Sequence, residues 1–261
     1  MRRFTAEYLE TTRDGMWGDS REALGDLELD RRQRALDVGA GIGNLTRVLR
    51  EEIPGEVVAL DADRTLLEAI SPPRILGDAM RLPFPDDTFD LVVCQALLVN
   101  LSAPLEAIRE FARVSSDCVA VVEPDNSAVS IESSVDVEAP LARRARELYL
   151  DGVTTDAALG AAPSLFEAAG LEAVSVRRYD HARRIESPYS ERALESARRK
   201  ASGTGLETDR ETILAGGATP ELFDSLREDW RAMGREVVTQ MQDGTYHQRE
   251  IVPFYVTAGH V

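Results

Sequence analysis

A short glycine-rich run, which follows an apolar segment, is the part of the sequence best suited to contact a ligand. The run is Asp37-Val38-Gly39-Ala40-Gly41-Ile42-Gly43, and an amphipathic segment comes after it. Glycines let the backbone turn sharply and approach a ligand without a Cβ in the way. A dinucleotide-binding run needs glycine at the sixth place counted from Gly39, where this chain has Asn44, so the run argues against a nicotinamide-dependent enzyme. Taken alone, it also fits a tight turn that binds nothing.

Two further carboxylates stand at comparable places along the chain. Asp61 follows the apolar residues 57–60, and Asp78 follows the short apolar run 74–76. Asp61 is suited to accept hydrogen bonds from two ribose hydroxyls, or else to cap the next helix; Asp78 is suited to accept from an exocyclic amine such as that of adenine, or else to form a turn. Three carboxylates at the carboxyl ends of successive strands are more specific than one, because open α/β sheets bind ligands at that edge.

The elements that must position these residues alternate along the first half of the chain. Continuously apolar runs predict strands that are covered on both faces, and amphipathic segments between them predict helices. This alternation predicts an α/β fold with a doubly wound, mostly parallel sheet. We expect strands over residues 35–38, 57–60, 74–76, 89–94, 118–122, 171–179 and 251–257, and helices over 44–52, 64–70, 104–114, 139–150, 163–169, 188–201 and 219–242.

In combination, these motifs resemble class I S-adenosylmethionine-dependent methyltransferases, and most of all the group that acts on small molecules. The resemblance covers about residues 30–182 and the last strand. It departs at Ser115-Ser116-Asp117, where the family usually has a proline-glycine turn. It implies the Rossmann-like methyltransferase fold with seven strands. The matching stretches are residues 36–43, 58–63, 77–83, 85–90, 107–114, 121–124 and 165–171.

The resemblance also implies roles for individual residues. Asp37 would orient the methionine amino group of S-adenosylmethionine, Asp61 would hold the ribose hydroxyls, and Asp78 would bind the adenine amine. Trp17 belongs to an N-terminal stretch that often closes over the cofactor in this family, although plain helix packing is the preferred explanation for this residue. The expected cofactor contacts are Asp37, Gly39, Ala40, Gly41, Gly43, Asp61, Ala62, Asp78, Ala79, Gln95 and Trp17.

Methyl transfer from a sulfonium is an in-line displacement that requires the acceptor to be held about 3 Å from the methyl group. A general base is needed only where the acceptor is protonated. His247 and Tyr246, just before the last strand, are the candidate catalytic residues, and ordinary residues at the rim of a pocket are the alternative. The expected substrate pocket consists of Tyr8, Leu98, Asn100, Glu123 and Asn126.

The expected domain organisation follows from the same resemblance. Residues 1–30 form an N-terminal helical segment over the cofactor, 31–184 the α/β core, and 246–261 the final antiparallel strand. Residues 185–245 form a helical insertion where a short hairpin would suffice. We expect this insertion to cap the substrate; a peripheral helical pair or a dimer surface is the alternative.

The charge balance narrows the range of partners. The 261 residues carry 46 acids and 30 bases, a net charge of −16, and Lys200 is the single lysine. Such an acidic protein surface repels phosphate backbones and therefore disfavours binding to nucleic acid. It fits either a salt-rich cytoplasm or a GC-rich genome that favours arginine over lysine. A basic stretch over residues 177–200 keeps an RNA methyltransferase as an alternative, beside a non-catalytic S-adenosylmethionine-binding protein.

The remaining features predict an ordinary cytoplasmic enzyme. Cys94 and Cys118 lie in apolar runs and read as reduced core residues, so neither a disulfide nor a metal site is expected. The longest apolar run, residues 91–101, is too short to cross a membrane. Residues 1–7 are not followed by the apolar stretch of a signal peptide. The expected partner is a small-molecule acceptor, with S-adenosylhomocysteine as the product, and the expected oligomeric state is a monomer or a homodimer.

Overall fold

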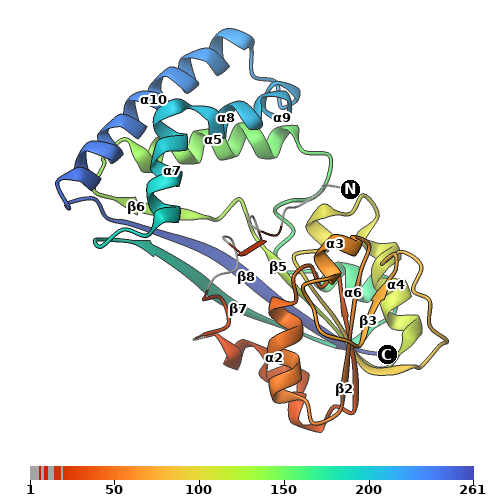
Figure 1. Cartoon of the computed structure of the whole chain (residues 1–261). Coiled ribbons are helices and arrows are strands. Elements are labelled where there is room, and N and C mark those ends of the chain that lie inside the picture. The colour runs from red at the N-terminus through yellow and green to blue at the C-terminus, as the bar shows by residue number, and fades with distance from the viewer. Residues whose placement is uncertain (1–5, 7–8, 11–14, 19) are drawn as a thin grey trace. The chain divides into compact units, whose positions relative to one another are not determined.

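The computed structural model describes residues 6, 9–10, 15–18 and 20–261, and it divides into two compact units (Figure 1). The first unit comprises Met1–Asp125, Leu159–Tyr179 and Pro253–Val261. The second comprises Asn126–Ala158 and Asp180–Val252. Residues 126–158 therefore group with the later helices, whereas the sequence placed them in the α/β core and began the helical insertion at residue 185. The role of this insertion as a substrate cap stays a prediction.

The first unit contains a parallel sheet in which β1 lies at the centre. The strand order is β3-β2-β1-β4-β5, with β8 antiparallel to β5 through residues 254–260. The chain crosses from one side of β1 to the other between β3 and β4, so β1 and β4 form the switch point at which such sheets bind ligands. The strands are β1 (Arg34–Val38), β2 (Glu56–Asp61), β3 (Arg74–Leu76), β4 (Phe89–Gln95), β5 (Ser115–Pro124) and β8 (Gln248–His260).

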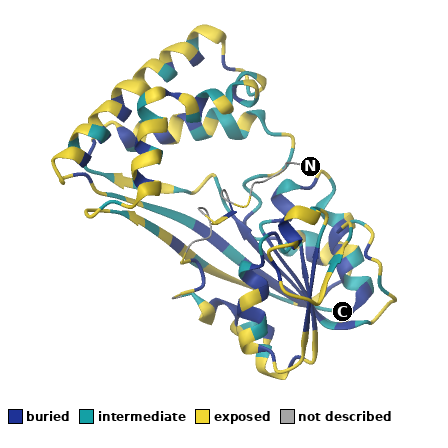
Figure 2. Ribbon diagram, in the orientation of Figure 1, coloured by how far each residue is buried: buried dark blue, intermediate teal, exposed yellow. Residues whose placement is uncertain are grey.

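Helices and 3-10 turns surround this sheet, in which the edge strand β3 is mostly exposed, whereas β1, β2, β4 and β5 are buried over most of their length (Figure 2). Their continuous burial is the reason why the strands are apolar throughout and do not alternate. The bounds predicted for α2, α4 and α6 are confirmed, and α3 is shorter than expected. The elements are η1 (Arg21–Leu27), η2 (Leu29–Arg31), α2 (Asn44–Glu52), α3 (Arg64–Leu67), η3 (Leu98–Asn100), α4 (Pro104–Val114) and α6 (Pro163–Ala169).

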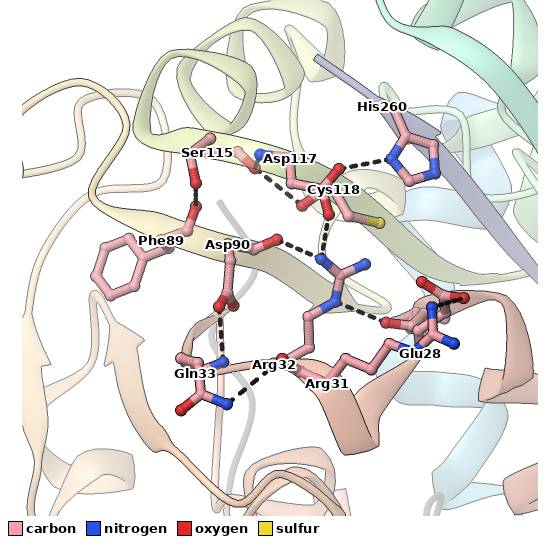
Figure 3. A network of polar contacts seen from close by, with 12 residues as sticks. Glu28, Arg31, Arg32, Gln33, Phe89, Asp90, Ser115, Asp117, Cys118 and His260 are labelled. Carbon is pink, nitrogen blue, oxygen red and sulfur yellow. Dashed lines mark hydrogen bonds and ion pairs between the residues drawn. The ribbon is translucent and has the colours of Figure 1, made fainter.

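A polar network joins strands at the edge of the sheet where the parallel strands begin (Figure 3). The buried guanidinium of Arg32 donates to the carbonyl oxygens of Leu27 at 2.8 Å and Asp90 at 2.9 Å, and it pairs with Asp117. The Nδ1 atom of His260 lies 2.9 Å from the Asp117 carboxylate. Through these contacts the Asp117 carboxylate connects β5 with β8 and with the segment before β1.

The second unit adds a strand that the sequence did not predict. β6 (Ser130–Ser133) pairs antiparallel with residues 248–251 of β8. β7 (Glu172–Ile185) also pairs with β8. The described residues therefore form eight hydrogen-bonded strands. The predicted count of seven missed β6 because its Ser-Ile-Glu-Ser sequence carries one apolar residue. The helices of this unit are α5 (Glu138–Gly152), α7 (Glu191–Ser202), α8 (Thr204–Thr208), α9 (Arg210–Ala215) and α10 (Pro220–Gln242).

The start of α10 confirms the helix signal in the sequence. The Thr219 side chain accepts a hydrogen bond from the Leu222 backbone amide at 3.2 Å, and Pro220 occupies the first helical position. A proline there sacrifices no hydrogen bond, because the first amides of a helix have no partner within it. No helix of the described chain is both long and apolar enough to cross a membrane.

Candidate functional site

The glycine-rich loop between β1 and α2 depends on its glycines for two physical reasons. Gly39, Gly41 and Gly43 have φ angles of +70°, +57° and +83°, which side-chain-bearing residues rarely adopt. A Cβ on Gly39 would also lie 2.9 Å from the Cδ1 atom of Leu97, in the loop after β4. The backbone amide of Gly39 donates to the Leu60 carbonyl oxygen at 2.7 Å, which ties the loop to the end of β2.

Asp61 connects the end of β2 with the glycine-rich loop. Its carboxylate accepts hydrogen bonds from the backbone amides of Gly41 and Asp63, both at 2.8 Å. The cap of α3 is Asp63, which accepts from the Thr65 amide at 2.8 Å. Asp61 is therefore not the capping residue of that helix, and its carboxylate lies beside the loop.

Asp37 is the next-to-last residue of β1, just before the glycines, and it is only 1% exposed. One oxygen of its carboxylate accepts from the Thr46 hydroxyl at 2.5 Å. Thr46 lies in the first turn of α2, and the sequence analysis missed it. A hydroxyl residue one helical turn after a glycine-rich loop is the signal that could have identified it, because that position faces back toward the end of the strand.

Asp78 follows β3 and is exposed. Its carboxylate accepts from the Met80 amide at 3.0 Å, which is the geometry of an Asx turn. The turn that the sequence offered as the alternative is therefore present, and contact between Asp78 and adenine stays a prediction. Ala79 beside it is buried.

The strand register brings the three aspartates to one edge of the sheet. Asp37 is the next-to-last residue of β1, Asp61 is the last residue of β2, and Asp78 comes two residues after β3. Because these parallel strands are neighbours, with Asp37 opposite Ala59 and Asp61 opposite Leu76, the three carboxylates lie at the carboxyl ends of adjacent strands. Ionised carboxylates only accept hydrogen bonds. This edge therefore suits a ligand that presents several donors, such as ammonium, hydroxyl and amine groups, and it disfavours a pyrophosphate.

Gln95 and Trp17, two of the predicted cofactor contacts, lie together and are buried. The Trp17 indole donates to the Gln95 side-chain oxygen at 3.5 Å, and the Gln95 amide contacts the Met16 sulfur at 2.8 Å. The Trp17 ring also packs against Tyr179, with centroids 5.6 Å apart. Trp17 thus has a packing role near the end of β4, and its contact with a cofactor stays a prediction.

Two of the predicted substrate residues face the interior. Leu98 and Glu123 are 1% and 0% exposed, and a substrate role for either residue stays a prediction. Leu98 comes shortly after β4 and Glu123 is the next-to-last residue of β5, as the sequence predicted.

The other predicted substrate residues are half-buried or undescribed. The Asn100 side chain donates to the Ala96 carbonyl at 2.9 Å, and the Asn126 side chain, in the second unit, donates to the Ala157 carbonyl at 2.5 Å. Tyr8 lies outside the described residues. A substrate role for Asn100 and Asn126 stays a prediction.

Tyr246 lies in the interior of the second unit, where it is 1% exposed. Its hydroxyl donates to the Glu138 carboxylate at 2.9 Å, and the Lys200 ammonium pairs with the same carboxylate at 2.5 Å. Burial, together with the negative charge of Glu138, raises the pKa of Tyr246 above its ordinary value. These contacts give Tyr246 a structural role and disfavour it as a base. The sequence analysis missed Glu138, which carries no local signal of burial.

His247, the second predicted catalytic residue, is exposed. Its backbone amide donates to the Ser134 hydroxyl at 3.1 Å, and its carbonyl accepts from the Ser134 amide at 3.0 Å. These contacts fix the backbone just before β8, and neither of them involves the imidazole ring of His247. Catalytic roles for His247 and Tyr246 stay predictions.

Comparison with known families places the glycine-rich loop and all three aspartates in one recognised domain. Residues 36–117 match the family described as a methyltransferase domain. The match extends from β1 into β5, so it contains the switch point of the sheet. Together with the fold, it confirms the predicted resemblance to class I S-adenosylmethionine-dependent methyltransferases.

Curated relatives each match less than half of the chain. An uncharacterized methyltransferase of Schizosaccharomyces pombe is 35% identical over 99 residues, which are 31% of this chain and 36% of that protein. A demethylmenaquinone methyltransferase of Lysinibacillus sphaericus is 37% identical over 111 residues, 39% of this chain and 44% of that protein. The chain thus spans about half or less of the length of such relatives.

Solved structures extend the similarity in fold to nearly the whole chain. A putative methyltransferase from Bacillus halodurans has a TM-score of 0.52 at 16% identity, covering 93% of this chain and 98% of that one. A SAM-dependent methyltransferase from Archaeoglobus fulgidus has a TM-score of 0.51 at 13% identity, covering 98% of both chains. At these identities the similarity shows the fold, which is the Rossmann-like methyltransferase fold predicted from the sequence.

Proposed function

We propose that this protein is an S-adenosylmethionine-dependent methyltransferase that moves a methyl group to an oxygen, nitrogen or carbon atom of a small or medium-sized acceptor. The observation that carries the proposal is the row of three carboxylates beside the glycine-rich loop. Asp37, Asp61 and Asp78 follow three neighbouring strands inside the recognised methyltransferase domain.

The residues at this edge fit the cofactor chemically. S-adenosylmethionine presents a methionine ammonium, two ribose hydroxyls and an adenine amine, and each is a hydrogen-bond donor that a carboxylate can accept. Asp37 would hold the ammonium, Asp61 the ribose hydroxyls and Asp78 the adenine amine. The backbone at Gly39 and Gly41 would lie beneath the cofactor, where the lack of a Cβ permits close approach.

When bound, S-adenosylmethionine supplies an electrophilic methyl group on a sulfonium, and S-adenosylhomocysteine is the product. The protein must orient that methyl group toward the acceptor and exclude water. Asp37 and Asp61 would contribute by fixing the methionine end and the ribose of the cofactor at the edge of the sheet. A protein base is required only for acceptors that are protonated in their reactive state, so a methyltransferase can function with positioning residues alone.

A small-molecule acceptor is supported by the relatives and by the charge of the chain. One relative is named a demethylmenaquinone methyltransferase, which indicates a small-molecule reaction for that protein. The net charge of −16 disfavours the phosphate backbone of RNA or DNA. Acceptor panels should therefore begin with phenols, amines and hydroquinones.

Calorimetric titration of the full chain with S-adenosylhomocysteine, S-adenosylmethionine and NAD tests the proposal. The titrations should be run in low salt and in molar salt, because the acidic composition has two explanations. We expect about micromolar binding of the first two ligands and none of NAD. A circular dichroism spectrum at each salt concentration shows whether the protein is folded. Absence of S-adenosylhomocysteine binding by folded protein in both salts would overturn the proposal.

A second measurement distinguishes a methyltransferase from a protein that binds the cofactor without catalysing transfer. The protein is incubated with S-adenosylmethionine labelled in its methyl group and with pooled acceptors of each class. Transfer of label to one class supports the enzyme and identifies the acceptor atom. Binding without transfer to any class would favour the non-catalytic alternative.

A further inference from the structure

Glu123, near the end of β5, is a completely buried carboxylate for which the proposed cofactor contacts give no role. Its exposed fraction is 0%. One carboxylate oxygen accepts from the backbone amides of Leu97 at 3.0 Å and Leu98 at 2.9 Å, and the other accepts from the amide of Val99 at 3.3 Å. Three consecutive amides of the loop after β4 thus converge on a side chain of the adjacent strand.

This arrangement fixes the conformation of the loop. A buried carboxylate is costly unless hydrogen-bond donors surround it, and here the donors are backbone groups that must point the same way. Ala96, the residue before them, has a φ angle of +47°, in the left-handed region that alanine rarely adopts. Such a conformation persists only where its surroundings impose it. The hydrogen bonds of Glu123 to residues 97–99 contribute to that constraint, together with the hydrogen bond from the Ala96 amide to the Val122 carbonyl oxygen at 2.8 Å.

The same loop contacts the predicted cofactor site at two places. The Leu97 side chain lies against Gly39, where even a Cβ would be 2.9 Å from its Cδ1 atom. Gln95, which ends β4 just before the loop, contacts Trp17 and Met16. The loop after β4 therefore contacts the glycine-rich loop through Leu97. The residue that precedes this loop, Gln95, contacts the N-terminal residues Trp17 and Met16.

We propose that Glu123 is a positioning residue for the cofactor site, acting through the amides of residues 97–99 and the contact between Leu97 and Gly39. The inference rests on the proposed function, because it assigns the effect of Glu123 to the cofactor. In this role Glu123 acts through the backbone of the loop after β4 and not by direct contact with the cofactor.

The variant Glu123→Gln tests this role without changing the size of the side chain. The amide oxygen can still accept at one position, but the amide nitrogen then faces a backbone N–H, and two donors meet. The loop must shift to separate them, and Leu97 shifts with it. We expect S-adenosylhomocysteine to bind about tenfold more weakly, measured by calorimetry well below the unfolding temperature of the variant.

Asp90→Asn is the matched control. The Asp90 carboxylate also accepts backbone amides, those of Gln33 at 2.6 Å and Arg34 at 3.2 Å, but it does so where the parallel strands begin. The same change of carboxylate to amide there should lower the melting temperature and leave affinity for S-adenosylhomocysteine within about twofold of wild type. A purely structural role for Glu123 predicts that the two variants behave alike.

Two further variants complete the test. Glu123→Asp keeps the carboxylate, and we expect it to recover part of the affinity that Glu123→Gln loses. Leu97→Ala leaves the three hydrogen bonds in place and removes the contact with Gly39, so it should also weaken binding. If Glu123→Gln does not fold, Leu97→Ala decides: weaker binding supports the proposal, and unchanged binding overturns it.

The outcomes separate the positioning role from the function itself. Wild type that binds, with Glu123→Gln weakened and Asp90→Asn unchanged, supports the positioning role. Wild type and Glu123→Gln that bind equally well overturn it and leave the proposed function intact. Folded wild type that does not bind S-adenosylhomocysteine overturns both.

Discussion

Replacement of Asp61 by alanine is the change that most directly probes the proposed cofactor site. In the structure the Asp61 carboxylate holds the Gly41 amide at 2.8 Å and lies at the carboxyl end of β2. The change removes an anchor of the glycine-rich loop together with the acceptor proposed for the ribose hydroxyls. Both losses act on the same ligand, because the loop and the ribose lie at one edge of the sheet.

The expected size of the effect follows from the contacts. A hydrogen bond to a charged group contributes about 1.5–3 kcal/mol, and part of that is recovered when water replaces the lost partner at a half-exposed position. We therefore expect S-adenosylhomocysteine to bind more weakly by about 1–3 kcal/mol, which corresponds to about 5- to 150-fold in the dissociation constant. The freed Gly41 amide adds a smaller loss of stability.

Asp63→Ala provides the control within the same loop. Asp63 caps α3 by accepting from the Thr65 amide, so its loss should cost about 1 kcal/mol of stability. Cofactor affinity should not change in this variant. Calorimetric titration and urea unfolding on both variants separate the two effects, because each loses stability and only Asp61→Ala should lose affinity.

One result would refute the reasoning. If Asp61→Ala binds S-adenosylhomocysteine as tightly as wild type and as Asp63→Ala, the Asp61 carboxylate does not hold the ribose. The glycine-rich loop would then be a structural turn whose tie to Asp61 serves the fold alone.

Two further predictions concern stability. Tyr246→Phe should lower the free energy of unfolding by about 1–3 kcal/mol, because the buried Glu138 carboxylate loses a hydrogen-bond donor. The affinity for S-adenosylhomocysteine should not change. Urea unfolding measures the first effect and calorimetric titration the second. Burial would raise the pKa of Asp117, but Arg32 and His260 lower it below the ordinary 3.8. That stabilisation is complete above the unfolded-state pKa and is lost as the pH falls through the folded-state pKa. Asp117→Asn should therefore make the melting temperature less dependent on pH below about pH 5, as measured by thermal unfolding at a series of pH values.

Local patterns were sufficient to predict the elements that form the proposed cofactor site. The bounds of α2, α4, α6 and α10 follow from helical periodicity, prolines at the first helical position and glycines beyond the end. The parallel strands follow from short apolar runs. The order of Asp37, Asp61 and Asp78 along the chain then places them at one edge, because parallel strands all end on the same side of a sheet.

Elements without such patterns were missed or misplaced. β6 has four residues and one apolar side chain, and α8 and α9 have five and six residues, too few for a clear period. Pairing with β8 decides whether residues 130–133 form a strand, and β8 lies more than a hundred residues away in the sequence. No window of neighbouring residues contains that information.

The sequence by itself therefore determined the fold class, the glycine-rich loop and the edge at which three carboxylates gather. Tertiary structure alone decided what individual polar side chains do. In the first unit Glu123 supports residues 97–99 and Asp63, not Asp61, caps α3; within the second unit Tyr246 bonds to Glu138. The physical reason is that periodicity records only whether a position faces the interior. The partner of a buried polar group is set by which distant segment lies opposite, and that is fixed only when the strands and helices pack.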